Sequence, residues 1–191
     1  LEFRRVLFRS RVTGLQRRGQ DQAGRGYAVT LESGATIPAD AVVLTTPAYV
    51  TADLIRSISP AAAGPLSRIP YASTATVSLA YEADAVGPAV RGFGFVVPRV
   101  ERRQLLAATW TSRKWAHRAP ASRVLVRCYL GGVGRETLLE CDDPAIVTVV
   151  REELAQLAGI RAVPTYATVY RWWRGMPQYH VGHEDQLRSE E

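Results

Sequence analysis

Hydrophobic and polar positions change their period along this chain near residue 60. Before that point the sequence predicts three short strands with glycine-containing turns between them, at 11–17, 27–31 and 36–39. The apolar run at 41–45 is continuous, as is typical of a strand that is buried on both faces. After Pro47, apolar residues at spacings of three predict a helix over 49–58, and a second short helix extends to residue 69.

From residue 73 onward the pattern alternates with a period of two. It predicts five strands joined mainly by polar turns, at 74–81, 92–97, 104–111, 123–130 and 163–173. Successive strands of this kind favour an antiparallel sheet. One long helix is predicted at 145–158, because Asp142, Asp143 and Pro144 form a start signal and Gly159 a stop. The residues alone thus indicate a mixed α/β (α+β) fold.

Composition adds limits to this picture. No apolar run approaches the roughly 18–20 residues that span a bilayer, so the sequence predicts no transmembrane helix. Residues 1–10 share no pattern with the rest of the chain, lack the features of a signal peptide, and are interpreted as a non-native leader. Cys128 and Cys141 form no CxxC pair, which favours reduced thiols in a cytoplasmic protein.

The net charge of +6 raises the question of a nucleic-acid partner. Lys114 is the only lysine, and an excess of arginine beside abundant alanine and valine is what a GC-rich genome produces. The basic residues are scattered, and no nucleic-acid-binding motif is present. We therefore expect no nucleic-acid partner, whereas a small acidic substrate is compatible with the charge.

Few residues suggest chemistry by themselves. The sequence contains neither a GxGxxG turn nor a phosphate-binding Walker loop. His180 and His183 are three residues apart, a spacing that suits either a metal ion or two histidines at the start of a helix. The second interpretation is preferred, so no metal site and no catalytic side chain are assigned.

Several motifs occur along the chain in the order of a known family. They are GFGFVVP at 92–98, WTS at 110–112, RAP at 118–120, YLGG at 129–132, RW at 171–172, MPQY at 176–179 and VGH at 181–183. In this order the chain resembles the oxygen-dependent protoporphyrinogen and coproporphyrinogen oxidases over essentially residues 11–191. The motif ADAVVLTTPA at 39–48 is looser, and flavin amine oxidases share it.

This resemblance implies a fold, a cofactor and a reaction. It implies part of an FAD-binding dinucleotide domain at 11–59, a substrate domain on an antiparallel or mixed sheet at 60–170, and a return toward the FAD domain at 171–191. It further implies six-electron oxidation of a porphyrinogen in haem biosynthesis, with FAD as cofactor and O2 as the oxidant that regenerates it. Coproporphyrinogen III is the preferred substrate and protoporphyrinogen IX the second; peripheral membrane contact is compatible with the sequence.

The resemblance also assigns site residues. It places Phe93, Val96, Thr109 and Tyr129 on the wall of the substrate cavity. Phe93 could instead belong to the core of the sheet, although its flanking glycines would allow a flat ligand to approach. Thr109 and Tyr129 depart from the apolar types expected there, and their polar groups would suit a more carboxylated substrate.

Two positions match cofactor contacts in the family. Val12 corresponds to a residue whose backbone meets the adenine ring, and Trp172 to a residue near the flavin. A plain core strand and an aromatic residue that covers a strand end are the respective alternatives.

Other parts of the family pattern have no counterpart here. The glycine-rich pyrophosphate turn, the arginine that pairs with a substrate propionate and the stretch that closes over the flavin do not match any segment. We therefore expect an interior fragment that binds FAD poorly by itself. Two other functions are compatible with parts of the sequence: an amine or polyamine oxidase, and a non-catalytic domain that binds a ligand through Trp172, Trp173 and arginines.

Overall fold

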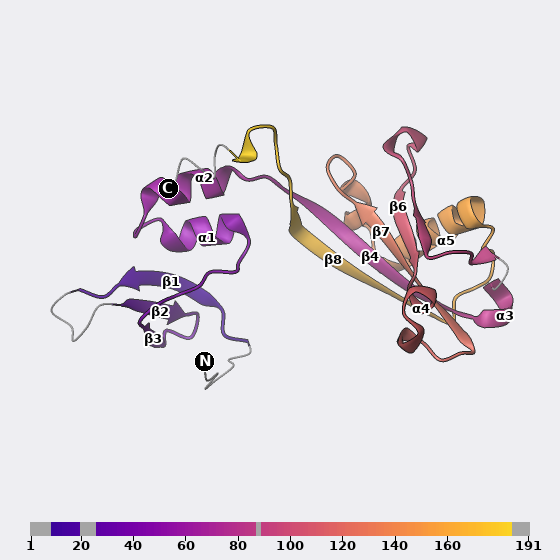
Figure 1. Cartoon of the computed structure of the whole chain (residues 1–191), viewed down its shortest axis with the longest axis horizontal. Coiled ribbons are helices and arrows are strands. Elements are labelled where there is room, and N and C mark those ends of the chain that lie inside the picture. Colours follow the sequence, from indigo (N-terminus) through magenta and orange to yellow (C-terminus); the bar gives the residue numbers. More distant parts are fainter. Residues whose placement is uncertain (1–8, 20–25, 87–88, 185–191) are drawn as a thin grey trace. The chain divides into compact units, whose positions relative to one another are not determined.

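The computed structural model describes residues 9–19, 26–86 and 89–184. The chain forms two compact units, one from residues up to Pro70 together with those from Gln178, and one from Tyr71 to Pro177 (Figure 1). We call them unit 1 and unit 2 and describe each by itself.

Unit 1 contains a three-stranded antiparallel sheet and two helices. The strands pair in the order β1, β2, β3, with bounds Val12–Arg17, Tyr27–Leu31 and Thr36–Ala39. Helix α1 spans Ala48–Ile55 and α2 spans Pro60–Arg68, where Pro60 suits the first helical turn because its missing N–H needs no partner there. The three strands and both helices confirm the predictions for this half of the chain.

The apolar run at 41–45 is an exception, because it forms no strand. Val43 is 87% exposed, and among the residues that the structure describes no strand pairs with this segment. Hydrophobicity alone could not place it, since a strand also needs a neighbour that accepts and donates its main-chain hydrogen bonds. The prediction of a buried strand here was wrong for the described part of the chain.

Unit 2 is built on a five-stranded sheet in the order β5, β6, β7, β4, β8, in which every neighbouring pair is antiparallel (Figure 1). The strands are β4 at Tyr71–Glu82, β5 at Gly94–Val96, β6 at Leu105–Trp110, β7 at Arg123–Gly131 and β8 at Tyr166–Pro177. Short helical turns connect them: α3 at Ala83–Val86, η2 at Arg99–Glu101, α4 at Thr111–Lys114, η3 at Ala116–Arg118 and η4 at Thr137–Glu140. The antiparallel sheet predicted from the alternation is confirmed.

Helix α5, at Asp143–Ala158, covers one face of this sheet. The side chain of Asp142 caps it by accepting a 2.9 Å hydrogen bond from the backbone N–H of Ala145, and Gly159 ends it in the left-handed conformation. Alternate residues of the central strands pack against it. The core of this face comprises Ala75, Val77, Leu79 and Tyr81 of β4, Val124, Val126, Cys128 and Leu130 of β7, and Ile146, Val150 and Leu154 of α5.

The boundaries between the units do not coincide with the change of hydrophobic pattern near residue 60. Helix α2 begins at Pro60 and packs with α1, so it belongs to unit 1 and the boundary falls after Pro70. Strand β8 likewise runs on to Pro177, past the boundary predicted at residue 171. The pattern changed where a helix begins, whereas packing decides to which unit that helix belongs.

Candidate functional site

The face of the sheet opposite α5 carries the candidate site. Because strand residues alternate between faces, the residues between those of the core point to this second side. We call this surface the open face. It comprises Val96 of β5, Ala107 and Thr109 of β6, Arg127 and Tyr129 of β7, Thr74, Thr76 and Ser78 of β4, and Thr168, Tyr170 and Trp172 of β8.

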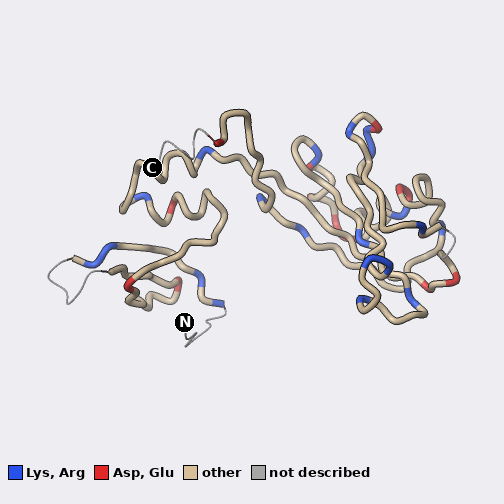
Figure 2. Tube along the Cα trace, viewed as in Figure 1, with Lys and Arg blue, Asp and Glu red and all other residues tan. Residues whose placement is uncertain are grey.

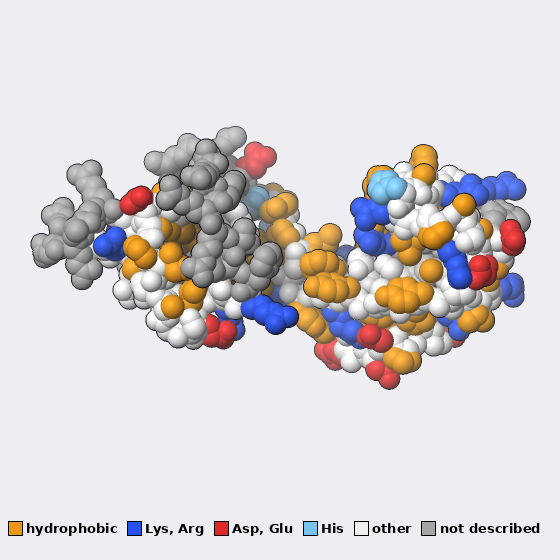
Figure 3. All heavy atoms as spheres, turned by 90° about the horizontal axis from the view of Figure 1, so that it is seen from below, with side chains coloured by type: hydrophobic (Ala, Val, Ile, Leu, Met, Phe, Trp, Pro, Cys, Tyr) orange, Lys and Arg blue, Asp and Glu red, His pale blue; other side chains and the backbone are white. Residues whose placement is uncertain are grey.

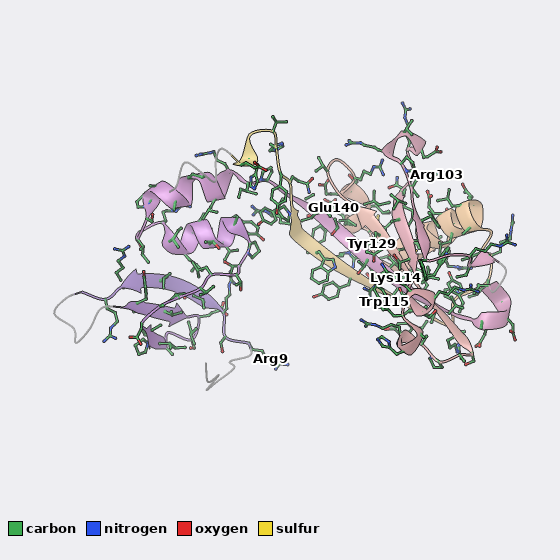
Figure 4. All side chains as sticks on the ribbon, in the orientation of Figure 1. Arg9, Arg103, Lys114, Trp115, Tyr129 and Glu140 are labelled. Carbon is green, nitrogen blue, oxygen red and sulfur yellow. The ribbon has the colours of Figure 1, made fainter. Side chains whose placement is uncertain are left out.

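One row of residues crosses all five strands of this face. Tyr129 lies opposite Thr76 of β4 and, on its other side, opposite Ala107 of β6. The row is completed at its two ends by Val96 and Tyr170. Residues that face each other across antiparallel strands have Cβ atoms about 5 Å apart, so these side chains form a continuous strip. We call it the Tyr129 row; Figure 4 labels Tyr129 on the sheet.

A second row lies one step along the strands. It runs from Gly94 through Thr109, Arg127 and Ser78 to Thr168. Two residues along a strand advance by about 7 Å, so Thr109 is a diagonal neighbour of Tyr129. The register therefore brings together Val96, Thr109 and Tyr129, three of the four residues predicted to line a substrate cavity.

Phe93, the fourth, comes directly before β5. Its carbonyl oxygen accepts a 2.9 Å hydrogen bond from the backbone N–H of Trp110, and its side chain is 65% exposed. Phe93 therefore lies outside the core, and the core position of this segment belongs to Phe95, whose ring contacts Trp110 edge-on at 5.7 Å. Val96 is 78% exposed.

The glycine between these phenylalanines has a structural cause. Gly94 has a φ of +141°, and a Cβ at this position would lie 2.1 Å from the carbonyl oxygen of Ala108. The glycine therefore lets β5 approach β6, so the close approach of a flat ligand is not needed to explain it.

Trp172 lies at the edge of the open face, on β8. It faces Thr74 across the strand pair, and its ring packs against that of Tyr170 with 4.5 Å between the centroids. Both side chains are about half exposed, at 50% and 59%. Val12, the other predicted cofactor contact, is the first residue of β1 and belongs to unit 1.

Most charged side chains of the five strands have partners. Arg171 points to the covered side, where it pairs with Asp143 and donates to two main-chain oxygens. At one end of the sheet Arg123 pairs with Glu82, with 2.7 Å between nitrogen and oxygen. Among the residues that the structure describes, the guanidinium of Arg127 forms no ion pair and donates no hydrogen bond, although its main chain is paired with both neighbouring strands.

Burial controls the chemistry of the covered face. Cys128 is fully buried, and burial raises the pKa of its thiol from 9.0 to about 12. Burial likewise raises the pKa of the neighbouring Tyr81. Neither group supplies a reactive anion near neutral pH, so the open face rather than the core is where ligand chemistry is possible.

The two histidines near the end of the described chain lie in unit 1. The ring of His183 packs on that of Tyr179 at 4.5 Å, and the backbone N–H of His183 donates to the carbonyl oxygen of His180 at 3.1 Å. Within the described ranges no group of three metal-binding side chains occurs. Over the same residues no helix is long and apolar enough to cross a membrane.

Sequence reasoning missed several residues of the open face. Thr76, Tyr170 and Arg127 were not singled out, although each is two residues from, or directly opposite, a residue that was. The alternation along each strand shows which face of the sheet these residues occupy, but the register between strands is needed to show that they are neighbours of the predicted residues. Figure 2 shows that arginines are spread over both units, so charge alone does not mark Arg127.

Comparisons with known proteins place this geometry in context. The chain matches the family model described as flavin containing amine oxidoreductase over residues 4–191. It is 34% identical over 167 residues to a coproporphyrinogen III oxidase of Bacillus subtilis (strain 168), which covers 87% of this chain and 35% of that protein. It is 32% identical over 176 residues to the chloroplastic protoporphyrinogen oxidase of Oryza sativa subsp. japonica, and this match covers 86% of this chain and 33% of that protein.

A solved structure gives a similar result. A protein from Exiguobacterium sp. 255-15, provisionally named a protoporphyrinogen oxidase, superposes with a TM-score of 0.76 at 26% identity. The superposition covers 94% of this chain and 38% of that chain. The chain thus spans about a third of the length of the relatives that it matches.

Proposed function

The chain belongs to the flavin containing amine oxidoreductase family, and we propose that its open face binds the porphyrinogen of an oxygen-dependent oxidase in haem biosynthesis. The relatives named coproporphyrinogen III oxidase and protoporphyrinogen oxidase support this reaction. The observation that carries the proposal is the Tyr129 row, in which Val96 and Tyr129, both predicted as cavity wall, lie on the same sheet face on either side of Ala107.

The chemistry of the row suits a large, flat and mainly apolar ligand. Val96 and Tyr170 are exposed, although large apolar side chains usually gain free energy when they are covered. Figure 3 shows further hydrophobic side chains on the surface of unit 2. Aromatic and aliphatic side chains on a rigid sheet would bind one side of a macrocycle and exclude water from it, while threonine hydroxyls fix its orientation.

FAD is the proposed cofactor. The paired rings of Trp172 and Tyr170 present a half-exposed aromatic surface, which fits the edge of a flat ring system. The backbone of Val12 would contact the adenine part. When bound, a flavin accepts hydride equivalents from the substrate and passes electrons to O2. The residues of this chain contribute placement, orientation and exclusion of water.

Coproporphyrinogen III is the proposed substrate, with protoporphyrinogen IX as the second. Relatives named for each of the two reactions match this chain, so the matches do not separate the substrates. The polar side chains of Thr109 and Tyr129 favour coproporphyrinogen III, which bears more carboxylates. A cytoplasmic location is proposed because the Bacillus relative is a bacterial protein and the cysteines form no CxxC pair.

Titration of the full chain with coproporphyrin III tests the proposal. Binding is followed by quenching of tryptophan fluorescence, with circular dichroism to verify that each variant folds. Tyr129→Ala should weaken binding about tenfold because it removes an aromatic contact, and Tyr129→Phe should retain most of the affinity. Val100→Ala, which removes an exposed apolar side chain from η2, is the control.

Two results would oppose the proposal. If the wild-type chain fails to bind coproporphyrin III, or if Tyr129→Ala and Val100→Ala weaken it equally, the open face is not the porphyrin site. If the chain binds a polyamine, and the bound polyamine is displaced by excess polyamine but not by coproporphyrin III, an amine oxidase of the same family is favoured.

A further inference from the structure

Arg127 is the residue of the open face that the proposed function does not yet explain. It lies in the middle strand of the sheet, β7, opposite Thr109 on one side and Ser78 on the other. It is two residues from Tyr129, so both side chains leave the same face of the strand. Its side chain is exposed.

The electrostatic surroundings of Arg127 are unusual for the centre of a sheet. Its cross-strand neighbours carry hydroxyl groups and no charge, and across the described residues its guanidinium has neither an acidic partner nor a hydrogen-bond acceptor. By contrast, Arg123 and Arg171 are each paired with a carboxylate. A guanidinium with five free N–H donors is a ready partner for a carboxylate, which it can bind through two parallel hydrogen bonds.

The spacing of the rows connects this arginine to the Tyr129 row. The row that holds Arg127 lies about 7 Å from the Tyr129 row, and an extended arginine side chain spans a similar distance. A flat ligand that covers Tyr129 and Thr76 would therefore bring its rim over Arg127. The hydroxyls of Thr109 and Ser78 flank the guanidinium and could donate to the same group.

We propose that Arg127 is a carboxylate-binding residue that fixes the rim of the macrocycle by pairing with a propionate side chain. This inference rests on the proposed function and adds to it a determinant of orientation and specificity. It predicts that the open face distinguishes a carboxylated tetrapyrrole from the same ring with its carboxylates blocked. Arginine rather than lysine is needed, because only its planar fork matches both carboxylate oxygens.

The test compares two probes with one ring system. Coproporphyrin III carries free carboxylates, and its tetramethyl ester carries none; both are titrated into the full chain in the same dilute detergent. Arg127→Gln should weaken binding of coproporphyrin III about tenfold and leave binding of the ester within about twofold. Arg127→Lys should lie between, because it keeps the charge but loses the fork.

Arg161→Gln is the matched control, since Arg161 is also exposed but comes after α5 and lies outside the sheet. It should change neither affinity. Raising the salt concentration should weaken coproporphyrin III binding to the wild type more steeply than to Arg127→Gln, because a charge pair is screened.

The outcomes separate the two proposals. If the wild type binds both probes and Arg127→Gln affects both equally or neither, the carboxylate role is overturned while the porphyrin site stands. If the wild type binds neither probe, both proposals fail. A selective loss for coproporphyrin III in Arg127→Gln, absent in Arg161→Gln, supports both.

Discussion

Arg171 of β8 pairs with Asp143 of α5, with 2.6 Å between Nη1 and Oδ1. The same guanidinium donates from Nε to the carbonyl oxygen of Leu139 at 2.8 Å and from Nη2 to that of Cys141 at 2.7 Å. One side chain thus ties the edge strand of the sheet to the segment that leads into its covering helix.

Removing this guanidinium should destabilise unit 2. Arg171→Gln loses the ion pair and leaves main-chain oxygens without their donor, so we expect the free energy of unfolding to fall by about 2 kcal/mol. Urea unfolding followed by circular dichroism measures the change. Arg127→Gln removes an arginine without such partners and should stay within about 0.5 kcal/mol; equal effects of the two variants would contradict the prediction.

Gly94 should tolerate no side chain. A Cβ there would overlap the carbonyl oxygen of Ala108, so Gly94→Ala must displace β5 from β6 and should lower stability by about 3 kcal/mol. Gly92 also has a positive φ, +66°, but a Cβ would meet nothing within 4 Å. Gly92→Ala should therefore lower stability by only about 1 kcal/mol. Thermal unfolding of both variants decides, and a larger loss for Gly92→Ala would refute the argument.

The two cysteines should differ in reactivity. Cys128 is buried with its pKa raised to about 12, whereas Cys141 is exposed. Because the thiolate is the reactive form and must also be reached, a disulfide reagent at neutral pH should modify one thiol of the native chain and both after denaturation. Cys141→Ala should abolish the native reaction, and rapid labelling that persists in this variant would count against a closed core.

Alkaline pH should weaken the fold. In the unfolded chain the thiol of Cys128 ionises near its ordinary pKa of 9.0, but in the folded chain it keeps its proton up to about 12. The folded state therefore binds more protons in this interval, and stability falls as pH rises from 9 toward 12. At pH 10 the loss from this group is about 1.4 kcal/mol.

Urea unfolding at pH 7.5 and pH 10 measures this dependence. The raised pKa of Tyr81 adds to the fall at still higher pH, with the same sign. Cys128→Ala should reduce the fall between the two pH values, and Cys141→Ala should leave it unchanged. A wild-type chain that is equally stable at both values would show that the thiol is not held protonated.

Local patterns predicted most of the individual elements. The alternation from residue 73 indicated the antiparallel sheet, and the charged residues, proline and glycine around α5 indicated both its ends. These signals succeed because each depends only on residues within one strand or one helical turn. The segment at 41–45 failed for the opposite reason, since a strand depends on a neighbour that its own residues do not specify.

The candidate site was harder to predict. Resemblance to a family supplied Val96, Thr109 and Tyr129, and the register then placed them together. Tyr170 and Arg127 needed the register itself, which joins strands that are far apart in the sequence. The register shows only that residues are neighbours, so every functional assignment stays a prediction, to be tested by the binding of flavin and porphyrin. These assignments concern Val12, Trp172, Phe93, Val96, Thr109 and Tyr129.

The pairing of β4 with β8 has a consequence for the order in which unit 2 assembles. Strands β6 and β7 are close in the sequence, whereas Tyr71 at the start of β4 must meet Pro177 at the end of β8. Closing a longer loop loses more chain entropy, by about 0.6 kcal/mol for each doubling of its length. Strand β8 is therefore expected to dock last. During synthesis, Tyr129 would contact its neighbours in β6 while Tyr170 and Trp172 are still being synthesised. The paired rings of Tyr170 and Trp172 would join the open face only in the final step.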